Sequence, residues 1–476
     1  MKARCRHRGD ALRGPLRSAV KDSSNRRTKP YSLVPGASLG MSSSPQGGRG
    51  GDALMRRAVA LAAIALLTAA GAGVAQTAGT DVNLTVKYGV LVALTGPSGA
   101  SGQLWNQATV VGVAYVNKTL KAMGLANHVQ AQLVDSQDSQ SQAAAGVEAA
   151  RKLVFIDHVN VVMGDILSAV TAAVATSVTI PNHIVEFTGG TATSLPDINP
   201  KGIPALLYQP PASNALEGVV LAQIMASTFG KRAAVNVAAE NDAYGAGLAA
   251  DFKSVWTAGG GTIPQYVLYN ETQPTLDTAA QQLVQGSPAG WLIIDFCPNL
   301  PKLIDPLQRT GKWRADRTFG GDTLSDCKSQ GQTSVPGMRV AKPYVGGGST
   351  LPQYQAFYQQ TATGGGGFQG WTAEAFDSVI VSFLAAVQAK SGDPARFAQY
   401  IAPLTNPPGT KYTFLQLDKA IGAILKGEKV QYEGVSGPLN FLSNGATGAP
   451  AFQIFEIQPD GTSRVVKELI VKARRS

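Results

Sequence analysis

Residues 84–94 read LTVKYGVLVAL, an almost unbroken run of aliphatic and β-branched residues. Such a run is typical of a strand that is buried on both faces of a parallel sheet. A glycine-rich loop follows at 96–102, and beyond it apolar residues recur four, three and four positions apart, at Leu104, Ala108, Val111 and Tyr115. This spacing predicts a helix, so the segment opens with a strand, a tight loop and a helix.

The same alternation of strand and helix continues along the chain. Because apolar strands separated by helices form right-handed βαβ units, it predicts parallel sheets that are covered by helices on both faces. About 400 residues also exceed what one hydrophobic core usually supports, so we expect two lobes. The further strands are expected at 128–134, 159–163, 183–187, 233–239, 263–269, 290–295, 317–320 and 337–345, with a β-rich tail at 437–441, 452–457 and 465–471.

The net charge of +10 belongs to the N-terminus alone. Residues 1–75 contain ten Arg and three Lys against three Asp and no Glu, whereas residues 76–476 carry 28 basic and 28 acidic side chains. A neutral domain does not attract a polyanion, so this distribution argues against a nucleic-acid partner. Hydrophobic residues make up 44% of the chain, which excludes a wholly disordered protein.

We expect the first 75 residues to lie outside the folded domain. Residues 1–54 are rich in Arg, Ser, Gly and Pro and lack apolar periodicity, so we interpret them as a disordered or mis-annotated leader. Residues 55–75 have the layout of a signal peptide, with Arg56 and Arg57 before an apolar run that ends in small residues. The alternative for this run is a membrane anchor, because its length is at the lower limit for crossing a bilayer. We expect the mature chain not to be embedded in a membrane.

Export would place the remaining cysteines in an oxidising compartment. Cys5 lies in the leader, so Cys297 and Cys327 are left as one even pair. We expect a disulfide between them. The alternative is two free buried thiols, which pack like small hydrophobic residues.

No catalytic or metal-binding signature is found in the sequence. Outside the leader, His128, His158 and His183 have no partner at the spacing of a metal site. The G-x-S-x-G match at 36–40 lies in the leader with no sheet around it, and the loop at 96–102 lacks the lysine and the spacing of a P-loop. The sequence therefore predicts neither an enzyme nor a bound metal or cofactor.

Polar and aromatic residues instead follow the predicted strands at their carboxyl ends. Open α/β sheets bind ligands at this edge, so the recurrence in both sheets predicts a binding cleft. The alternative for each residue is a local role, because serine and aspartate cap helices and loop threonines bond their own backbone. The residues are Ser168, Thr188, Thr191, Thr193, Asp242, Tyr244, Phe296, Cys297, Asp322 and Thr323.

Five motifs, in order along residues 84–469, carry a family resemblance. They are the opening strand with Leu94-Thr95-Gly96-Pro97, Met163-Gly164-Asp165 before Ser168, Asn241-Asp242-Ala243-Tyr244-Gly245-Ala246-Gly247, Gly437-Pro438-Leu439-Asn440-Phe441 and Pro459-Asp460-Gly461. Together they resemble the periplasmic substrate-binding proteins of branched-chain amino-acid ABC transporters, the leucine/isoleucine/valine-binding type. The resemblance implies a type I periplasmic binding fold, with two Rossmann-like lobes joined by three crossovers. Lobe one would comprise 84–205 plus 343–437, and lobe two 206–342 plus 438–476.

The resemblance further implies which side chains hold the ligand. On the first lobe, Ser168 and a threonine, Thr191 or Thr193, would bind an α-carboxylate. From the second lobe, Tyr244 and Asp322 would reach the ligand, with Asp322 as the counter-charge of an α-ammonium. The chemistry of these residues agrees, because a desolvated zwitterion needs donors at one end and a carboxylate at the other.

Trp105 and Phe296 would flank the ligand's side chain and select it by size. The resemblance thus predicts a periplasmic, monomeric, non-enzymatic protein that captures a small amino-acid-like solute and delivers it to an ABC permease. Members of the family also bind amides, urea-like compounds and aromatic acids. Two other classes stay open, a ligand-sensing domain that reports to a receptor and an exported enzyme.

Overall fold

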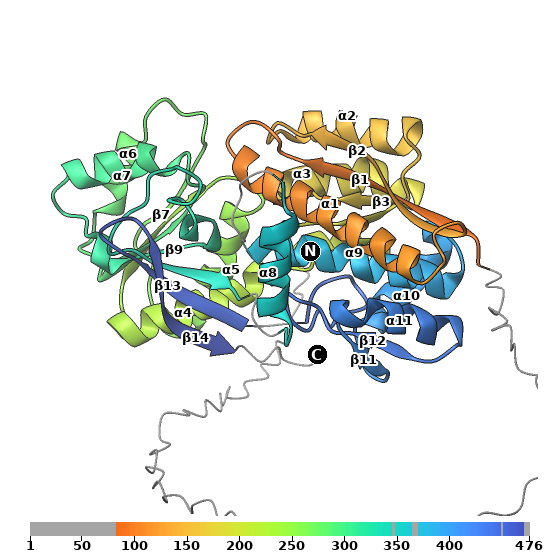
Figure 1. Ribbon diagram of the computed structural model, residues 1–476. Coiled ribbons are helices and arrows are strands. Elements are labelled where there is room, and N and C mark those ends of the chain that lie inside the picture. Colours follow the sequence, from red (N-terminus) through yellow and green to blue (C-terminus); the bar gives the residue numbers. More distant parts are fainter. Residues whose placement is uncertain (1–81, 345–347, 364–369, 449–450, 471–476) are drawn as a thin grey trace, which may run out of the picture. The chain divides into compact units, whose positions relative to one another are not determined.

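The computed structural model describes residues 82–344, 348–363, 370–448 and 451–470 (Figure 1). The expected leader at 1–54 and signal peptide at 55–75 lie outside these residues. Within them the chain forms two large sheets that are mostly parallel, which confirms the predicted α/β class. The chain passes between the two sheets three times, after Tyr208, after Pro343 and before Ala451.

The first sheet contains five parallel strands. The side chains of β1 (Leu84–Val92), the second strand across the sheet, alternate between the two faces: Val86, Tyr88 and Val90 enter one core and Leu91 enters the other. The order across the sheet is β2-β1-β3-β4-β5. The bounds are β1 (Leu84–Val92), β2 (Val129–Asp138), β3 (Val161–Met163), β4 (Val185–Phe187) and β5 (Leu207–Tyr208).

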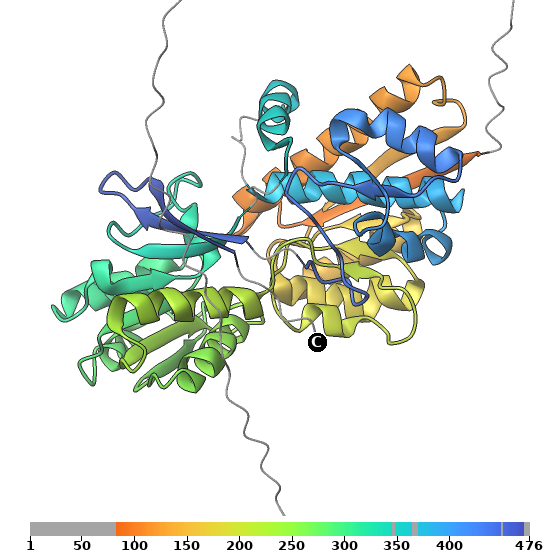
Figure 2. The ribbon, with the colours of Figure 1, turned by 90° about the horizontal axis from the view of Figure 1, so that it is seen from below.

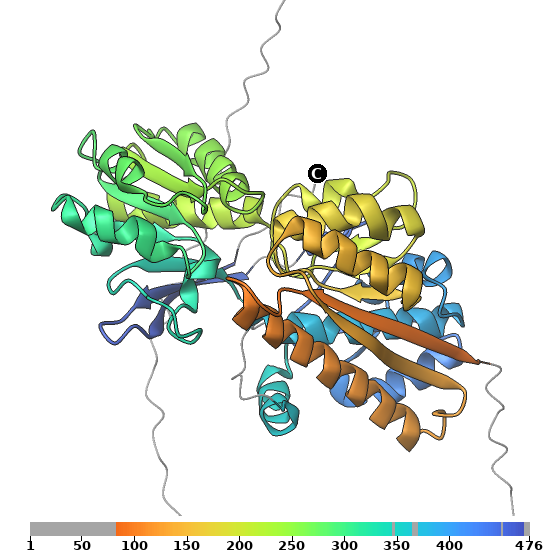
Figure 3. The same cartoon turned by 90° about the horizontal axis from the view of Figure 1, so that it is seen from above.

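Helices cover both faces of this sheet (Figure 3). On the Tyr88 face lie α1 (Gly99–Ala122) and α9 (Gly370–Ala389), and on the Leu91 face lie α2 (Ala143–Arg151) and α3 (Ser168–Val174). By length and composition α9 could cross a membrane, but 89% of its apolar window is buried, so it is a core helix. Sequence reasoning missed α8 (Leu351–Thr361), α10 (Pro394–Leu404), α11 (Leu417–Leu425) and the small parallel pair β11 (Thr410–Tyr412) and β12 (Val430–Tyr432).

The glycine-rich loop at 96–102 allows a close approach between α1 and the first sheet. Gly96 has a φ of +82°, a backbone conformation that favours glycine. A Cβ atom on Gly102 would lie 1.9 Å from the carbonyl oxygen of Ala93. Glycine at position 102 therefore lets the first turn of α1 lie directly against the end of β1.

The second sheet has seven strands and carries helices on both faces (Figure 2). Its order is β14-β13-β10-β9-β8-β6-β7, and only β13 and β14, from the C-terminal tail, run antiparallel to their neighbours. One face packs on α4 (Asn214–Phe229) and α5 (Gly245–Ala258), the other on α6 (Asp277–Leu283) and α7 (Leu300–Arg309). The strands are β6 (Val235–Glu240), β7 (Tyr266–Tyr269), β8 (Gly290–Ile294), β9 (Thr318–Gly320), β10 (Arg339–Pro343), β13 (Ala451–Ile457) and β14 (Ser463–Ile470).

Two short segments, β5 and residues 438–441, were expected in the second lobe. The structure places both with the first sheet. β5 pairs with β4, and Gln209 pairs with Ala446. Leu439 and Phe441, expected in a strand, lie in irregular backbone and are buried in the first core. The apolar pattern of so short a segment indicates burial but does not indicate in which core. The first lobe therefore comprises 82–209 plus 348–448, and the second lobe comprises 210–344 plus 451–470.

Candidate functional site

A pocket of about 630 Å³, part of it open to solvent, lies where the strands of both lobes end. Its lining comes from the start of α1, the segments that follow β3 and β4, the segments that follow β6, β8 and β9, and the start of α9. This is the sheet edge at which the sequence predicted a site. Five of the predicted ligand-binding residues line it, namely Ser168, Thr191, Tyr244, Phe296 and Asp322.

Ser168, the first residue of α3, has a hydroxyl proton that is free for a ligand. Its Oγ accepts hydrogen bonds from the backbone N–H groups of Thr191, at 3.2 Å, and Ala192, at 3.1 Å. These donors occupy the acceptor sites of the hydroxyl, and no acceptor for its own proton is found among the described residues. Ser168 is only 2% exposed, so an acceptor on a bound ligand is the natural partner for this proton.

The loop that contains Thr191 is fixed by hydrogen bonds to its backbone. The side-chain amide of Gln209 donates to the carbonyl oxygens of Gly190, at 3.0 Å, and Ala192, at 3.1 Å. The N–H of Asn214 donates to the carbonyl oxygen of Thr191 at 2.8 Å. The backbone polar groups of Thr191 are thus already paired, and its side-chain hydroxyl is the group that it can offer to a ligand.

Asp322 brings a carboxyl group to the pocket from the second lobe. Its Oδ1 accepts hydrogen bonds from the Tyr244 hydroxyl, at 2.6 Å, and from the N–H of Thr323, at 2.9 Å. Its Oδ2 is buried and has no partner within the described part of the chain. Burial raises the pKa of Asp322, while the Tyr244 hydroxyl and the charge of Lys342 lower it. An unpaired carboxylate oxygen in a pocket wall is a strong acceptor for a cationic group.

Tyr244 and Asp322 form one unit of the site. The phenol ring packs on Phe296, with 5.3 Å between the ring centroids. A Cβ atom on Gly321 would lie 2.5 Å from the Tyr244 hydroxyl, so glycine at this position lets the phenol reach Asp322. Burial and the charge of Asp322 raise the pKa of Tyr244 well above its ordinary value, which keeps the hydroxyl protonated as a donor.

A second carboxyl group, Glu217 on α4, lies behind Asp322. Its Oε1 accepts the backbone N–H of Asp322 at 2.9 Å, and its Oε2 has no partner among the described residues. Burial and repulsion by Asp322 raise the pKa of Glu217 well above its ordinary range. A neutral Glu217 leaves Asp322 as the charged member of the pair. No motif marks Glu217, and the chain separates the two residues by 105 positions, so the sequence did not reveal it.

The lining also contains Asp326, whose negative charge is neutralised by a lysine on β10. Lys342 is 9% exposed and forms an ion pair with Asp326. No lysine or arginine is found among the described residues that line the pocket. The charge that remains in the wall is therefore negative, and it favours a ligand that carries a cationic group.

Two of the predicted ligand-binding residues do not line the pocket. Thr193 is exposed, and its hydroxyl donates to Asp251 at 2.7 Å and accepts the N–H of Ala215 at 2.8 Å, so it holds the start of α4. Trp105 is fully buried in the core of the first lobe. Trp105 supports the pocket wall from the core side. A Cβ atom on Gly189, which lines the pocket, would lie 3.2 Å from the Trp105 ring.

Several lining residues were not predicted from the sequence, among them two serines and a tryptophan. Ser98 and Ser101 come from the start of α1, and Trp371 comes from the start of α9. A signal existed for the serines, which lie within the glycine-rich loop at the carboxyl end of the first strand. Trp371 had none, because it follows no predicted strand and lies in a helix that the sequence indicated only as apolar.

Cys297 and Cys327 form a disulfide, as expected, and their Cα atoms are 5.3 Å apart. Cys297 itself lines the pocket. The described residues contain no group of three or more His, Cys, Asp or Glu side chains that could hold a metal ion.

Two α/β lobes with a polar pocket at the carboxyl ends of their strands are the arrangement of proteins that enclose a small solute. The family model for periplasmic binding proteins matches residues 85–462, most of the chain. The chain therefore belongs to the periplasmic binding protein family. Members of this family work outside the cytoplasm with ABC transporter permeases and are typically not enzymes. No curated protein matches the sequence.

Solved structures of this fold are similar over most of the chain. A leucine-binding protein from Thermotoga maritima has 16% sequence identity and a TM-score of 0.64, covering 81% of this chain and 99% of its own. A solute-binding protein from Rhodopseudomonas palustris in complex with 4-hydroxybenzoate has 15% identity and a TM-score of 0.62, covering 82% and 98%. A branched-chain amino-acid binding protein from Streptococcus pneumoniae in complex with isoleucine has 16% identity and a TM-score of 0.59, covering 82% and 100%. At these identities the likeness establishes the fold and not the ligand.

Proposed function

We propose that this chain is a periplasmic solute-binding protein that encloses a small amino-acid-like ligand and delivers it to an ABC permease. The observation that carries the proposal is that one pocket contains hydroxyl donors from the first lobe and a carboxyl group from the second. Ser168 and Thr191 offer hydroxyl donors, while Asp322 offers an unpaired carboxylate oxygen. A zwitterion fits both, with its carboxylate on the hydroxyls and its ammonium on Asp322.

The chemistry of the pocket favours an amino acid over an aromatic acid. Neighbours of the same fold bind leucine, isoleucine or hydroxybenzoates according to their names. An aromatic acid has a carboxylate but no cation, so Asp322 would be buried beside it without a counter-charge. Phe296, Ile166 and Trp371 supply an apolar wall that suits an aliphatic or aromatic side chain.

The mode of action would be closure of the two lobes around the ligand. Contacts from Tyr244 and Asp322 on one lobe and Ser168 on the other are complete only when both lobes meet the same molecule, so the ligand shifts the population toward the closed state. We propose that the protein acts as a monomer after export by the signal peptide at 55–75. A receptor in place of a permease would use the same closure, and a pull-down with membrane partners distinguishes the two.

A thermal-shift screen of residues 76–476 tests the proposal. The panel contains amino acids, amides, urea-like compounds and hydroxybenzoates. A specific ligand at a hundred times its dissociation constant adds about 2.7 kcal/mol to the free energy of unfolding. We expect amino acids with apolar side chains to raise the melting temperature. A shift with amine-free acids alone would overturn the role of Asp322, and turnover of a bound compound would overturn the non-enzymatic role.

A further inference from the structure

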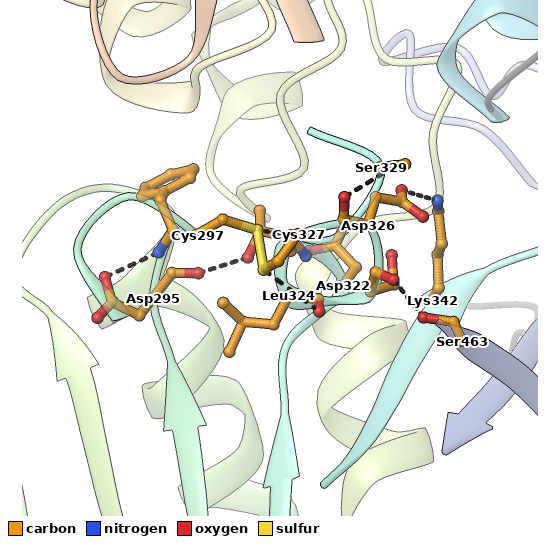
Figure 4. Close-up of a disulfide and its surroundings, with 12 residues drawn as sticks. Asp295, Cys297, Asp322, Leu324, Asp326, Cys327, Ser329, Lys342 and Ser463 are labelled. Atoms are coloured by element: carbon orange, nitrogen blue, oxygen red, sulfur yellow. Dashed lines mark hydrogen bonds and ion pairs between the residues drawn. A yellow bond between two sulfur atoms is a disulfide. The ribbon is translucent and has the colours of Figure 1, made fainter. Parts of the chain in front are cut away.

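The disulfide of the second lobe lies at the wall of the pocket and not in the interior of the sheet. Cys297 belongs to the loop after β8, and Cys327 belongs to the loop after β9. Figure 4 shows the bond between these two loops, beyond the ends of the strands, with Asp326 turned toward Lys342. β8 and β9 already pair through backbone hydrogen bonds. The disulfide therefore constrains the loops and not the strands below them.

The two linked loops supply much of the pocket lining, and they differ in chemistry. The first contributes an apolar stretch, Phe296, Cys297 and Pro298, directly before α7. The second contributes Asp322, Thr323, Asp326 and Gln330. A change in the distance between the loops would move the apolar wall relative to the carboxyl groups.

Several other contacts hold the second loop at its start and middle. At its start, the Thr323 hydroxyl donates to the carbonyl oxygen of Asp295 at 2.6 Å. At Ser325 the loop accepts the Ser463 hydroxyl at 2.5 Å, and at Asp326 it pairs with Lys342. None of these contacts joins the Asp326 to Gln330 turn to the Phe296 to Pro298 stretch. The covalent bond between Cys297 and Cys327 does join them.

We propose that the Cys297–Cys327 disulfide is a positioning element of the ligand pocket, which fixes the apolar wall of Phe296 and Pro298 against the polar wall of Asp326 and Gln330. Both cysteines are almost completely buried, at 2% and 1% exposure, so the bond is shielded from solvent. Loss of the bond lets the second loop sample more conformations, and ordering it again on binding costs conformational entropy. Affinity should then fall although neither sulfur holds the ligand's charged groups.

Hydrogen exchange tests the proposal without a ligand. The Cys297→Ala/Cys327→Ala chain is compared with the native chain by mass spectrometry of peptides that cover 295–299, 321–332 and, as an internal reference, 84–92. We expect the two loop peptides to exchange at least tenfold faster in the variant and the reference to stay unchanged. Unchanged loop exchange would overturn the proposal. If this variant does not fold, the Cys297→Val/Cys327→Ala chain, which fills more of the buried volume, replaces it.

A matched variant separates positioning from general destabilisation. Leu303, on α7, is fully buried in the same hydrophobic cluster as both cysteines but does not line the pocket. Leu303→Ala should therefore lower the melting temperature without accelerating exchange at 321–332 relative to the rest of the second lobe. Equal acceleration in both variants would mean that the disulfide is only a stability element.

Calorimetric titration with L-leucine tests the effect on binding, and this arm rests on the proposed function. At a temperature at which all chains are folded, we expect the cysteine variant to bind at least tenfold more weakly than the native chain and Leu303→Ala to stay within threefold. Equal losses in both variants would overturn the proposal. If the native chain binds no leucine, the proposed ligand class is in doubt, while the exchange experiment still decides the role of the disulfide.

Discussion

The pocket has a first wall, formed by lining residues of the first lobe, and a second wall, formed by lining residues of the second lobe. The two walls differ in the buried polar groups that they present to a ligand. On the first lobe, Ser168 and Thr191 are uncharged and most of their polar atoms are already paired with backbone groups. On the second lobe, Asp322 and Glu217 are two buried carboxyl groups, each with an oxygen that has no partner among the described residues. The first wall therefore offers a ligand only hydroxyl groups, whereas the second offers it an unpaired carboxylate oxygen. Selection between ligands should therefore depend mainly on the second wall.

This difference has an energetic basis. A buried hydroxyl that keeps its hydrogen bonds costs little, but a buried carboxylate without a counter-ion costs several kcal/mol unless it takes up a proton. The raised pKa values of Glu217 and Asp322 express that cost. A ligand ammonium would remove it, so part of the binding energy would come from relief of an electrostatic penalty that the folded chain already carries.

Asp322→Asn should have the largest effect, because it removes the charge and keeps the shape. We expect the affinity for a zwitterionic amino acid to fall at least a hundredfold, about 3 kcal/mol, since the ligand's ammonium would be buried without a counter-charge. The same change should raise the melting temperature of the unliganded chain, because a buried charge disappears. Isothermal titration calorimetry and thermal unfolding measure the two effects.

The opposite signs of these effects make the test sharp. A purely structural role for Asp322, as the cap of the turn that it begins, predicts lower stability in the variant together with weaker binding. An amine-free acid serves as the matched ligand, and its affinity should rise or stay unchanged in Asp322→Asn. Equal losses for both ligands would contradict a selective second wall.

Ser168→Ala should weaken binding about tenfold, because the ligand carboxylate loses one donor, worth about 1.4 kcal/mol. Thr193→Ala is the matched control from the same lobe. Its hydroxyl bonds Asp251 and the N–H of Ala215, away from the pocket lining. We expect this control to lower stability by about 1 kcal/mol and to leave the affinity unchanged. If Thr193→Ala weakened binding as much as Ser168→Ala, the first wall would extend further than the lining indicates.

The sequence was sufficient to predict those parts of the site that depend on strand ends. Each buried strand has a carboxyl end, and Ser168, Tyr244, Phe296 and Asp322 follow such ends closely enough to be placed at the pocket from the chain alone. Thr193 shows the limit of this reasoning. It lies only two positions beyond Thr191, yet it points to Asp251 and not to the pocket, because loop conformation and not strand polarity decides its direction.

Residues that reach the site through packing could not be predicted. Glu217 and Trp371 lie on helices whose apolar pattern indicates burial but not what they are buried against. Trp105, which the family resemblance placed beside the ligand's side chain, is instead a core residue of the first lobe. The helices α8, α10 and α11 were missed because their short amphipathic stretches lie among Gly and Pro residues that suggested loops.

Glu217→Gln should have little effect on binding, because glutamine is neutral and keeps the acceptor for the N–H of Asp322. We expect the affinity to stay within twofold, whereas Glu217→Ala leaves that N–H unpaired and should weaken binding about fivefold, close to 1 kcal/mol. Calorimetric titration of both variants provides the comparison. A loss in Glu217→Gln as large as in Glu217→Ala would mean that Glu217 carries charge and that the second wall holds two anions.

The smallest effect on binding is expected for a buried carboxyl group of the first lobe. Glu186 on β4 is fully buried, accepts the Thr179 hydroxyl at 2.5 Å and does not line the pocket. Burial raises its pKa to about 8, so the folded chain keeps this proton in a pH range in which the unfolded chain has lost it. Its stabilising contribution is full below the ordinary pKa of a glutamate and is lost as the pH rises toward 8.

Glu186→Gln should therefore remove a pH dependence and leave the affinity unchanged. Relative to the native chain, we expect its free energy of unfolding to gain about 1 kcal/mol per pH unit between pH 5 and pH 8, as measured by urea unfolding at fixed pH values. Glu148→Gln, at an exposed position on α2, is the matched control for the exchange of a glutamate for a glutamine. A flat difference for Glu186→Gln would mean that this carboxyl group is ionised in the folded chain. A loss of ligand affinity would mean that the first lobe, like the second, uses buried charge in binding.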